Sequence, residues 1–142
     1  MSSYRPHIRN EYDLERAWRI IAPPQEPRPH SLWIMLIGEG RRAFTQLTQV
    51  EDAFTVPPPE SGHVLPDFVR ELVDAVPAAV ERIAFLRTRP GHFGPTNEDL
   101  AWAECLYAVA GEVALRCETV FLATDLVLVP MPPAERSSLV SA

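Results

Sequence analysis

The sequence contains no lysine and only two cysteines, and these scarcities exclude several kinds of chemistry. Without lysine there is no side-chain amine for a Schiff base. All 13 basic side chains are arginines, whose planar guanidinium groups suit carboxylates and phosphates. Cys105 and Cys117 are too few for a disulfide framework or a zinc knuckle, so we expect a reducing, cytoplasmic setting.

Long apolar runs are also missing from the chain. No stretch approaches the roughly 18 apolar residues that a membrane span requires, and the first residues lack the apolar region of a secretion signal. We therefore expect no membrane partner. The 19 acidic residues outnumber the 13 basic ones, and the net charge of −6 argues against a nucleic-acid partner unless positive charge gathers on one face.

The length and composition are those of one globular domain. The chain has 142 residues, of which 46% are hydrophobic and 23% are charged. We expect a single domain over 1–142, with its core at about 10–130 and a flexible tail at 131–142. Proline clusters at 22–29 and 56–62 separate the expected helices and strands.

Hydrophobic periodicity predicts three helices and five strands. The helices are expected at 11–21, 66–76 and 97–115, and the strands at 31–37, 43–50, 82–86, 119–123 and 126–129. The expected inner stripe of the last helix consists of Leu100, Ala103, Leu106 or Tyr107, Ala110, and Val113 or Ala114. Some of the predicted strands are apolar throughout and others alternate between apolar and polar residues, and helices lie between them in the sequence. This pattern predicts an α/β (α+β) fold with a mixed β-sheet flanked by helices.

One segment combines a strand, a Pro-Gly loop and a helix start. The strand at 82–86 leads to Arg87-x-Arg89-Pro-Gly, and Thr96-x-x-Asp99 opens the following helix. This pattern resembles the JAB/MPN metalloprotease-like fold, especially its RadC-like bacterial branch, in which His-x-His-Pro and Ser-x-x-Asp hold a zinc ion. The flanking elements are similar as well, so the resemblance covers about residues 10–130. It implies a three-layer, cytidine-deaminase-like sandwich.

The metal-binding positions of that family are altered here. Arg87 and Arg89 stand where the two zinc-binding histidines are expected, and a protonated guanidinium has no free lone pair for a metal. The family's catalytic glutamate falls near His30, and Asp99 alone among the ligand positions is retained. The resemblance therefore implies a pseudoenzyme, for which we expect no catalytic residue, no metal and no cofactor.

The residues of this segment have two interpretations each. Thr96 and Asp99 are typical of a helix-capping box, which a ligand-binding role could accompany. Arg87 and Arg89 lie two residues apart on a strand and so share one face. They are either solvated or paired with Asp99 or Glu98, or they form an anion pocket with the unpaired N–H groups of the helix start.

The leading hypothesis is a non-catalytic module that binds an anionic small molecule or an acidic protein segment. The candidate ligand-binding residues are Arg87, Arg89, His92, Thr96 and Asp99. A homodimer is a further option, because small domains often bury a sheet edge or an apolar helix face in this way. The alternative is a divergent hydrolase or deaminase-like enzyme with a non-standard site around His30, His92 and Asp99.

Overall fold

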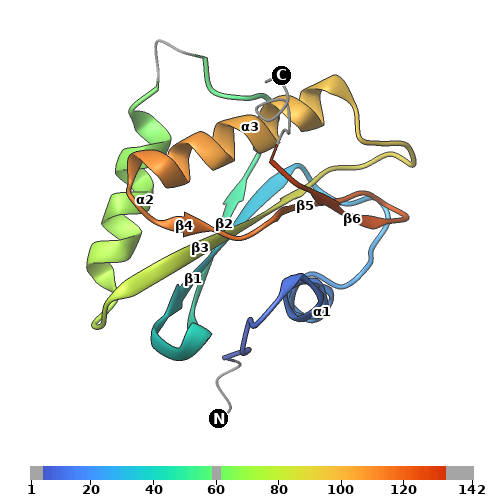
Figure 1. Cartoon of the computed structure of the whole chain (residues 1–142). Helices are drawn as coiled ribbons and strands as arrows, with labels where there is room; N and C mark the ends of the chain where they lie inside the picture. Colours follow the sequence, from blue (N-terminus) through green and yellow to red (C-terminus); the bar gives the residue numbers. More distant parts are fainter. Residues whose placement is uncertain (1–4, 59–61, 134–142) are drawn as a thin grey trace, which may run out of the picture.

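The protein is described by a computed structural model that covers residues 5–58 and 62–133. Within these residues a six-stranded mixed sheet has helices on both of its faces, as Figure 1 shows. The helices are α1 (Glu11–Ile21), α2 (Val64–Ala75) and α3 (Asn97–Glu112). The strands are β1 (Ser31–Gly38), β2 (Ala43–Glu51), β3 (Val80–Thr88), β4 (Arg116–Cys117), β5 (Val120–Ala123) and β6 (Leu128–Met131).

The strand order β2-β1-β3-β5-β6 places strands of both directions side by side, while the two-residue β4 also pairs with β3. β1 is antiparallel to β2 and to β3, whereas β3 is parallel to β4 and β5. A short 3₁₀ turn, η1 (Glu39–Arg41), joins β1 to β2. The prediction of an α/β (α+β) fold with a mixed sheet flanked by helices is confirmed at this level.

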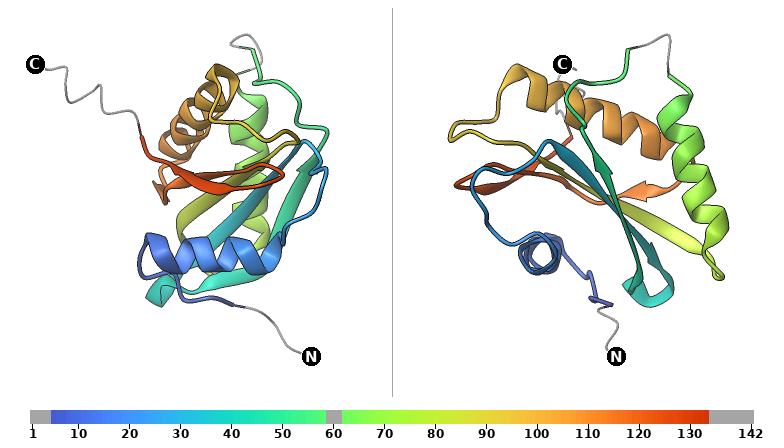
Figure 2. Two further views of the ribbon diagram at one scale, coloured as in Figure 1. Left: turned by 90° about the vertical axis from the view of Figure 1, so that its right-hand side faces the viewer. Right: turned by 180° about the vertical axis from the view of Figure 1, so that it is seen from behind.

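Side-chain alternation along β1 and β3 divides the apolar core between the two faces of the sheet. Ile34 and Phe85 belong to the cluster that packs against α2 and α3. Met35 and Ala84 belong to the cluster that packs against α1, which lies across the opposite face (Figure 2). Because both faces are covered, the central strands are apolar at nearly every position, as expected for a fully buried strand.

Local sequence signals account for where several helices begin or end. The Asn10 side chain accepts a hydrogen bond from the Asp13 N–H at 2.8 Å and caps α1. α2 ends at Ala75, two residues before Pro77, because proline lacks a backbone donor for the next turn. None of the described helices has the length and apolar character needed to cross a membrane.

Two predictions about the core are wrong. Leu100 is 54% exposed, while Asp99 and Trp102 face inward beside Ala103, because the hydrogen bonds of Asp99 hold a polar side chain on the buried face. The tail does not begin at residue 131: Met131 lies in β6, is 4% exposed and pairs with Val120. Residues 134–142 of the expected tail lie outside the described residues.

Candidate functional site

An arginine–aspartate pair joins the end of β3 to the start of α3. Arg89 Nε donates to Asp99 Oδ1 at 2.8 Å, and Arg89 Nη2 donates to Asp99 Oδ2 at 2.6 Å. The Asp99 side chain is 1% exposed and that of Arg89 is 12% exposed. Two parallel, charge-assisted bonds in a buried setting make this a strongly oriented contact. The ion-pair interpretation is therefore confirmed for Arg89.

The loop after β3 wraps around the same guanidinium group. Arg89 Nη1 donates to the Pro90 carbonyl at 2.9 Å, and Nη2 also donates to the Phe93 carbonyl at 2.6 Å. A Cβ atom at Gly94 would lie 2.5 Å from Arg89 Nη2, so a larger residue there would have to displace the guanidinium. Most of the N–H donors of Arg89 are therefore hydrogen-bonded to Asp99 and to the following loop.

The start of α3 forms the capping box that the sequence predicts. Thr96 Oγ1 accepts a bond from the Asp99 N–H at 3.2 Å, and the Thr96 N–H donates to Asp99 Oδ2 at 2.8 Å. Burial by itself raises the pKa of Asp99, but the bonds from Arg89 and Thr96 outweigh it and hold that pKa below its ordinary value. Asp99 is thus an ionised carboxylate with both oxygens engaged.

Arg87 lies in a different environment from Arg89, although both point to the same face of the sheet. Arg87 is 2% exposed, and its guanidinium carbon lies 4.9 Å from the centre of the Trp102 ring. Its Nη1 donates to the Ala53 carbonyl, while its buried Nε has no partner among the described residues. Burial lowers the pKa of Arg87, and nearby Asp99 opposes that shift.

No carboxylate in the described residues forms an ion pair with Arg87. The negative charges of Asp99 and Glu98 attract the Arg87 guanidinium at a distance, but neither carboxylate accepts a hydrogen bond from it. Arginine nevertheless stays protonated at neutral pH. Among the described residues, the site therefore contains a buried cation without an ion-pair partner.

His30 and Trp102 complete the surroundings of Arg87. The His30 carbonyl accepts the Ala53 N–H at 3.1 Å, and the His30 ring lies 4.7 Å from that of Phe54. His30 Nδ1 and Trp102 Nε1 are buried and, like Arg87 Nε, have no partner among the described residues. Sequence reasoning missed Trp102 and Ala53 as site residues, because no motif connects them with Arg87.

His92 does not join the arginines. It is exposed, and its Nε2 lies 3.2 Å from Glu26 Oε2. Within the described residues no hydrogen bond links His92 to Asp99 or to His30. Of the five candidate residues, the structure therefore brings together Arg87, Arg89, Thr96 and Asp99, and it directs His92 elsewhere.

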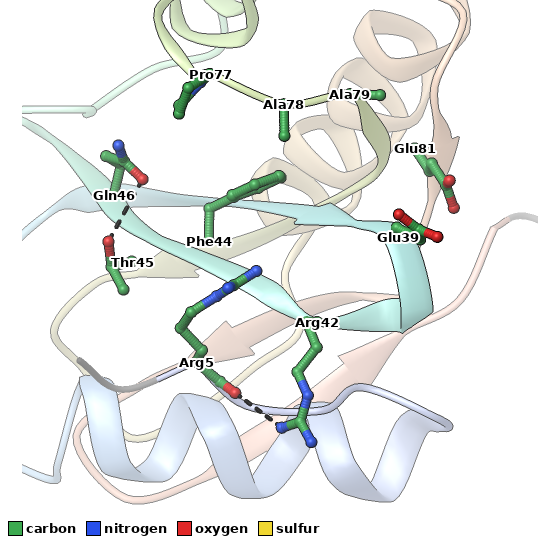
Figure 3. A pocket seen from close by; sticks show the side chains of 10 residues that line it. All are labelled: Arg5, Glu39, Arg42, Phe44, Thr45, Gln46, Pro77, Ala78, Ala79 and Glu81. Carbon is green, nitrogen blue, oxygen red and sulfur yellow. Dashed lines mark hydrogen bonds between the residues drawn. The ribbon is translucent and has the colours of Figure 1, made fainter. Parts of the chain in front are cut away.

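A separate cavity of about 570 Å³ lies at the other end of β3 (Figure 3). Phe44 lies between the loop 77–79 and the arginines Arg5 and Arg42, and Glu39 and Glu81 add opposite charge to the lining. The Arg5 guanidinium carbon is 5.4 Å from the centre of the Phe44 ring. None of the candidate residues from the sequence lines this cavity.

No protein-family model matches the sequence, and no curated protein does so either.

Proposed function

We propose that this chain is a non-catalytic binding module with a JAB/MPN-like framework, which recognises an anionic group through Arg87. The single observation that carries the proposal is a guanidinium that is 2% exposed and donates to no carboxylate among residues 5–58 and 62–133. Removing a charge from water without a partner is expensive, so buried cations are ordinarily paired. A bound anion would supply the missing partner.

The resemblance to the JAB/MPN family supports the non-catalytic part of the proposal. The mixed sheet with helices on both faces is the coarse fold that this resemblance implies. At the positions where the resembled family holds zinc, Arg89 and Asp99 are bonded to each other. A guanidinium cannot coordinate a metal, and Asp99 has both oxygens engaged by Arg89 and Thr96. The ion pair thus takes the place of a metal centre.

The ligand that this proposal expects is a small carboxylate or phosphate, because the planar guanidinium group binds these anions well. An unpaired buried N–H group costs about 1–3 kcal/mol, and Arg87 Nε is such a group. The start of α3 adds a favourable field for negative charge. Arg89 is committed to Asp99, so recognition depends on Arg87 and its neighbours and not on a pair of free arginines. The carboxylate side chain of an acidic protein segment has the same chemistry.

Thermal unfolding in the presence of citrate or phosphate tests the proposal. A ligand at one hundred times its Kd stabilises the folded state by about 2.7 kcal/mol, which raises the Tm of a domain this size by about 5–10 °C. We expect this rise for the wild type and its loss in Arg87→Met. Arg116→Met, which removes an exposed arginine from β4, is the matched control and should respond as the wild type does.

A second readout keeps the test decisive if Arg87→Met is poorly folded. The indole N–H of Trp102 lies in the same buried group, so its NMR resonance in the wild type should shift on titration with citrate. A Tm that rises equally in sodium chloride of matched ionic strength, with an unmoved Trp102 resonance, would show that Arg87 serves only the packing.

A further inference from the structure

Three loops that are distant in the sequence meet beside the ends of β3 and β5. Glu26 precedes β1, His92 follows β3, and Asp125 follows β5. Because β3 and β5 are parallel neighbours, their carboxyl ends lie at the same edge of the sheet, where open α/β sheets commonly bind ligands. One ligating atom from each of the three residues lies within 4.8 Å of the others.

Asp125 is held in place by the two neighbouring loops. Its Oδ1 accepts the Arg28 N–H at 2.8 Å, and its Oδ2 accepts the Gly91 N–H at 3.0 Å. These two bonds lower the pKa of Asp125 below its ordinary value, so the group is ionised at neutral pH. Each carboxylate oxygen has two lone pairs, and one on each oxygen remains for another partner.

The nearby arginine side chains do not compete for Asp125. Arg28 Nε donates to the Thr124 carbonyl at 2.6 Å, and Arg89 is bonded to Asp99. Across the site, His92 Nε2 lies 3.2 Å from Glu26 Oε2. Both of these side chains are exposed, so they are accessible from solvent and free to adjust their positions.

We infer that Glu26, His92 and Asp125 bind a divalent transition-metal ion, for which Zn²⁺ is the representative. The donor set of one imidazole nitrogen and two carboxylate oxygens suits this class of ion, and two carboxylates balance its charge. Three protein ligands leave a fourth position for water or an exogenous ligand. The site uses none of the positions at which the resembled family binds zinc, and it is independent of Arg87.

Calorimetric titration of Zn²⁺ into chelator-treated protein without a histidine tag tests this site. We expect one ion per chain, with the affinity reduced at least tenfold in His92→Ala and in Glu26→Gln. Both variants should fold, because the substituted side chains are exposed. His63→Ala removes another exposed histidine, at the start of α2, and is expected to bind as the wild type does.

Cobalt substitution supplies a second measurement. Co²⁺ in a site of low coordination number absorbs visible light more strongly than hexaaquo Co²⁺, and this absorption should disappear in His92→Ala. Absence of stoichiometric Zn²⁺ binding, or binding unaffected by His92→Ala and Glu26→Gln, would overturn the proposal. His92→Ala should still respond to citrate through Arg87, so failure of one proposal leaves the other testable.

Discussion

Replacing Asp99 by asparagine tests the energetic role of the ion pair between β3 and α3. Asparagine has nearly the same shape, and its amide oxygen can still accept the Thr96 N–H. The substitution removes the negative charge that faces Arg89 and one of the two oxygens that the guanidinium contacts. It therefore removes the charge and one acceptor of the pair while leaving an acceptor for the helix cap.

The expected cost follows from the burial of both partners. The side chains of Asp99 and Arg89 are 1% and 12% exposed. Removing one partner of a buried pair leaves an uncompensated charge and typically costs about 3–5 kcal/mol. This is a large fraction of the roughly 5–15 kcal/mol by which a domain is stable.

Urea unfolding of the wild type and of Asp99→Asn measures this cost. For a slope of about 2 kcal/mol per molar urea, the midpoint should fall by about 2 M. Asp67→Asn is a matched control, because Asp67 also lies in the first turn of a helix and pairs with Arg70 at 2.9 Å. The Arg70 side chain is 48% exposed and the Asp67 side chain is 64% exposed, so we expect Asp67→Asn to change the free energy of unfolding by less than about 1 kcal/mol.

The comparison between Asp99→Asn and Asp67→Asn shows whether burial strengthens the ion pair. Equal, small losses in Asp99→Asn and Asp67→Asn would refute the reasoning, because burial would then add nothing to the pair. A double variant with Arg89→Gln should lose less than the sum of the two single changes, since removing both charges leaves neither one unpaired.

Three further predictions concern other groups. The pKa of Asp99 is below its ordinary value in the folded protein. Its ionised carboxylate therefore contributes fully to folding stability above about pH 4, and this contribution is lost as the pH falls through the folded-state pKa. The difference in unfolding free energy between the wild type and Asp99→Asn should accordingly shrink in acid. Tyr107 donates to the Met131 carbonyl and accepts the Val120 N–H, so Tyr107→Phe should cost about 1–3 kcal/mol in urea unfolding. Burial raises the pKa of Cys117 to about 12, so its thiol should react slowly with a disulfide reagent at pH 8 until the protein is denatured.

Local sequence signals predict the three helices and five of the six strands, because each of these elements carries its own periodicity and boundary residues. They miss β4, whose two residues are too few to show a period. The predicted first helix, 11–21, agrees with α1, since Asn10 caps its start and prolines follow its end. β3 extends two residues beyond the predicted strand, to Thr88, because Thr88 pairs with Ser31 and Ala123 on the neighbouring strands. Such an extension depends on strands that are remote in the sequence.

The candidate site is predicted only in part, because only some of its features depend on residues that are close in the sequence. The capping box of Thr96 and Asp99 is a local motif, and the two-residue spacing places Arg87 and Arg89 on one face. The different environments of the two arginines are not predictable from that spacing. Arg87 is buried because Trp102 covers it and Ala53 accepts its hydrogen bond, and both residues come from other parts of the chain.

The sequence by itself determines the mixed helix and strand content, the capped start of α3, and the absence of histidine at the two strand-end positions. Only the tertiary structure decides that Arg89 is neutralised by Asp99, while Arg87 is buried with no ion-pair partner in the described part of the chain. The tertiary structure also places His92 beside Glu26 and Asp125. Periodicity and caps act over a few residues along the chain. Burial, ion pairing and the convergence of loops depend on which strands become neighbours.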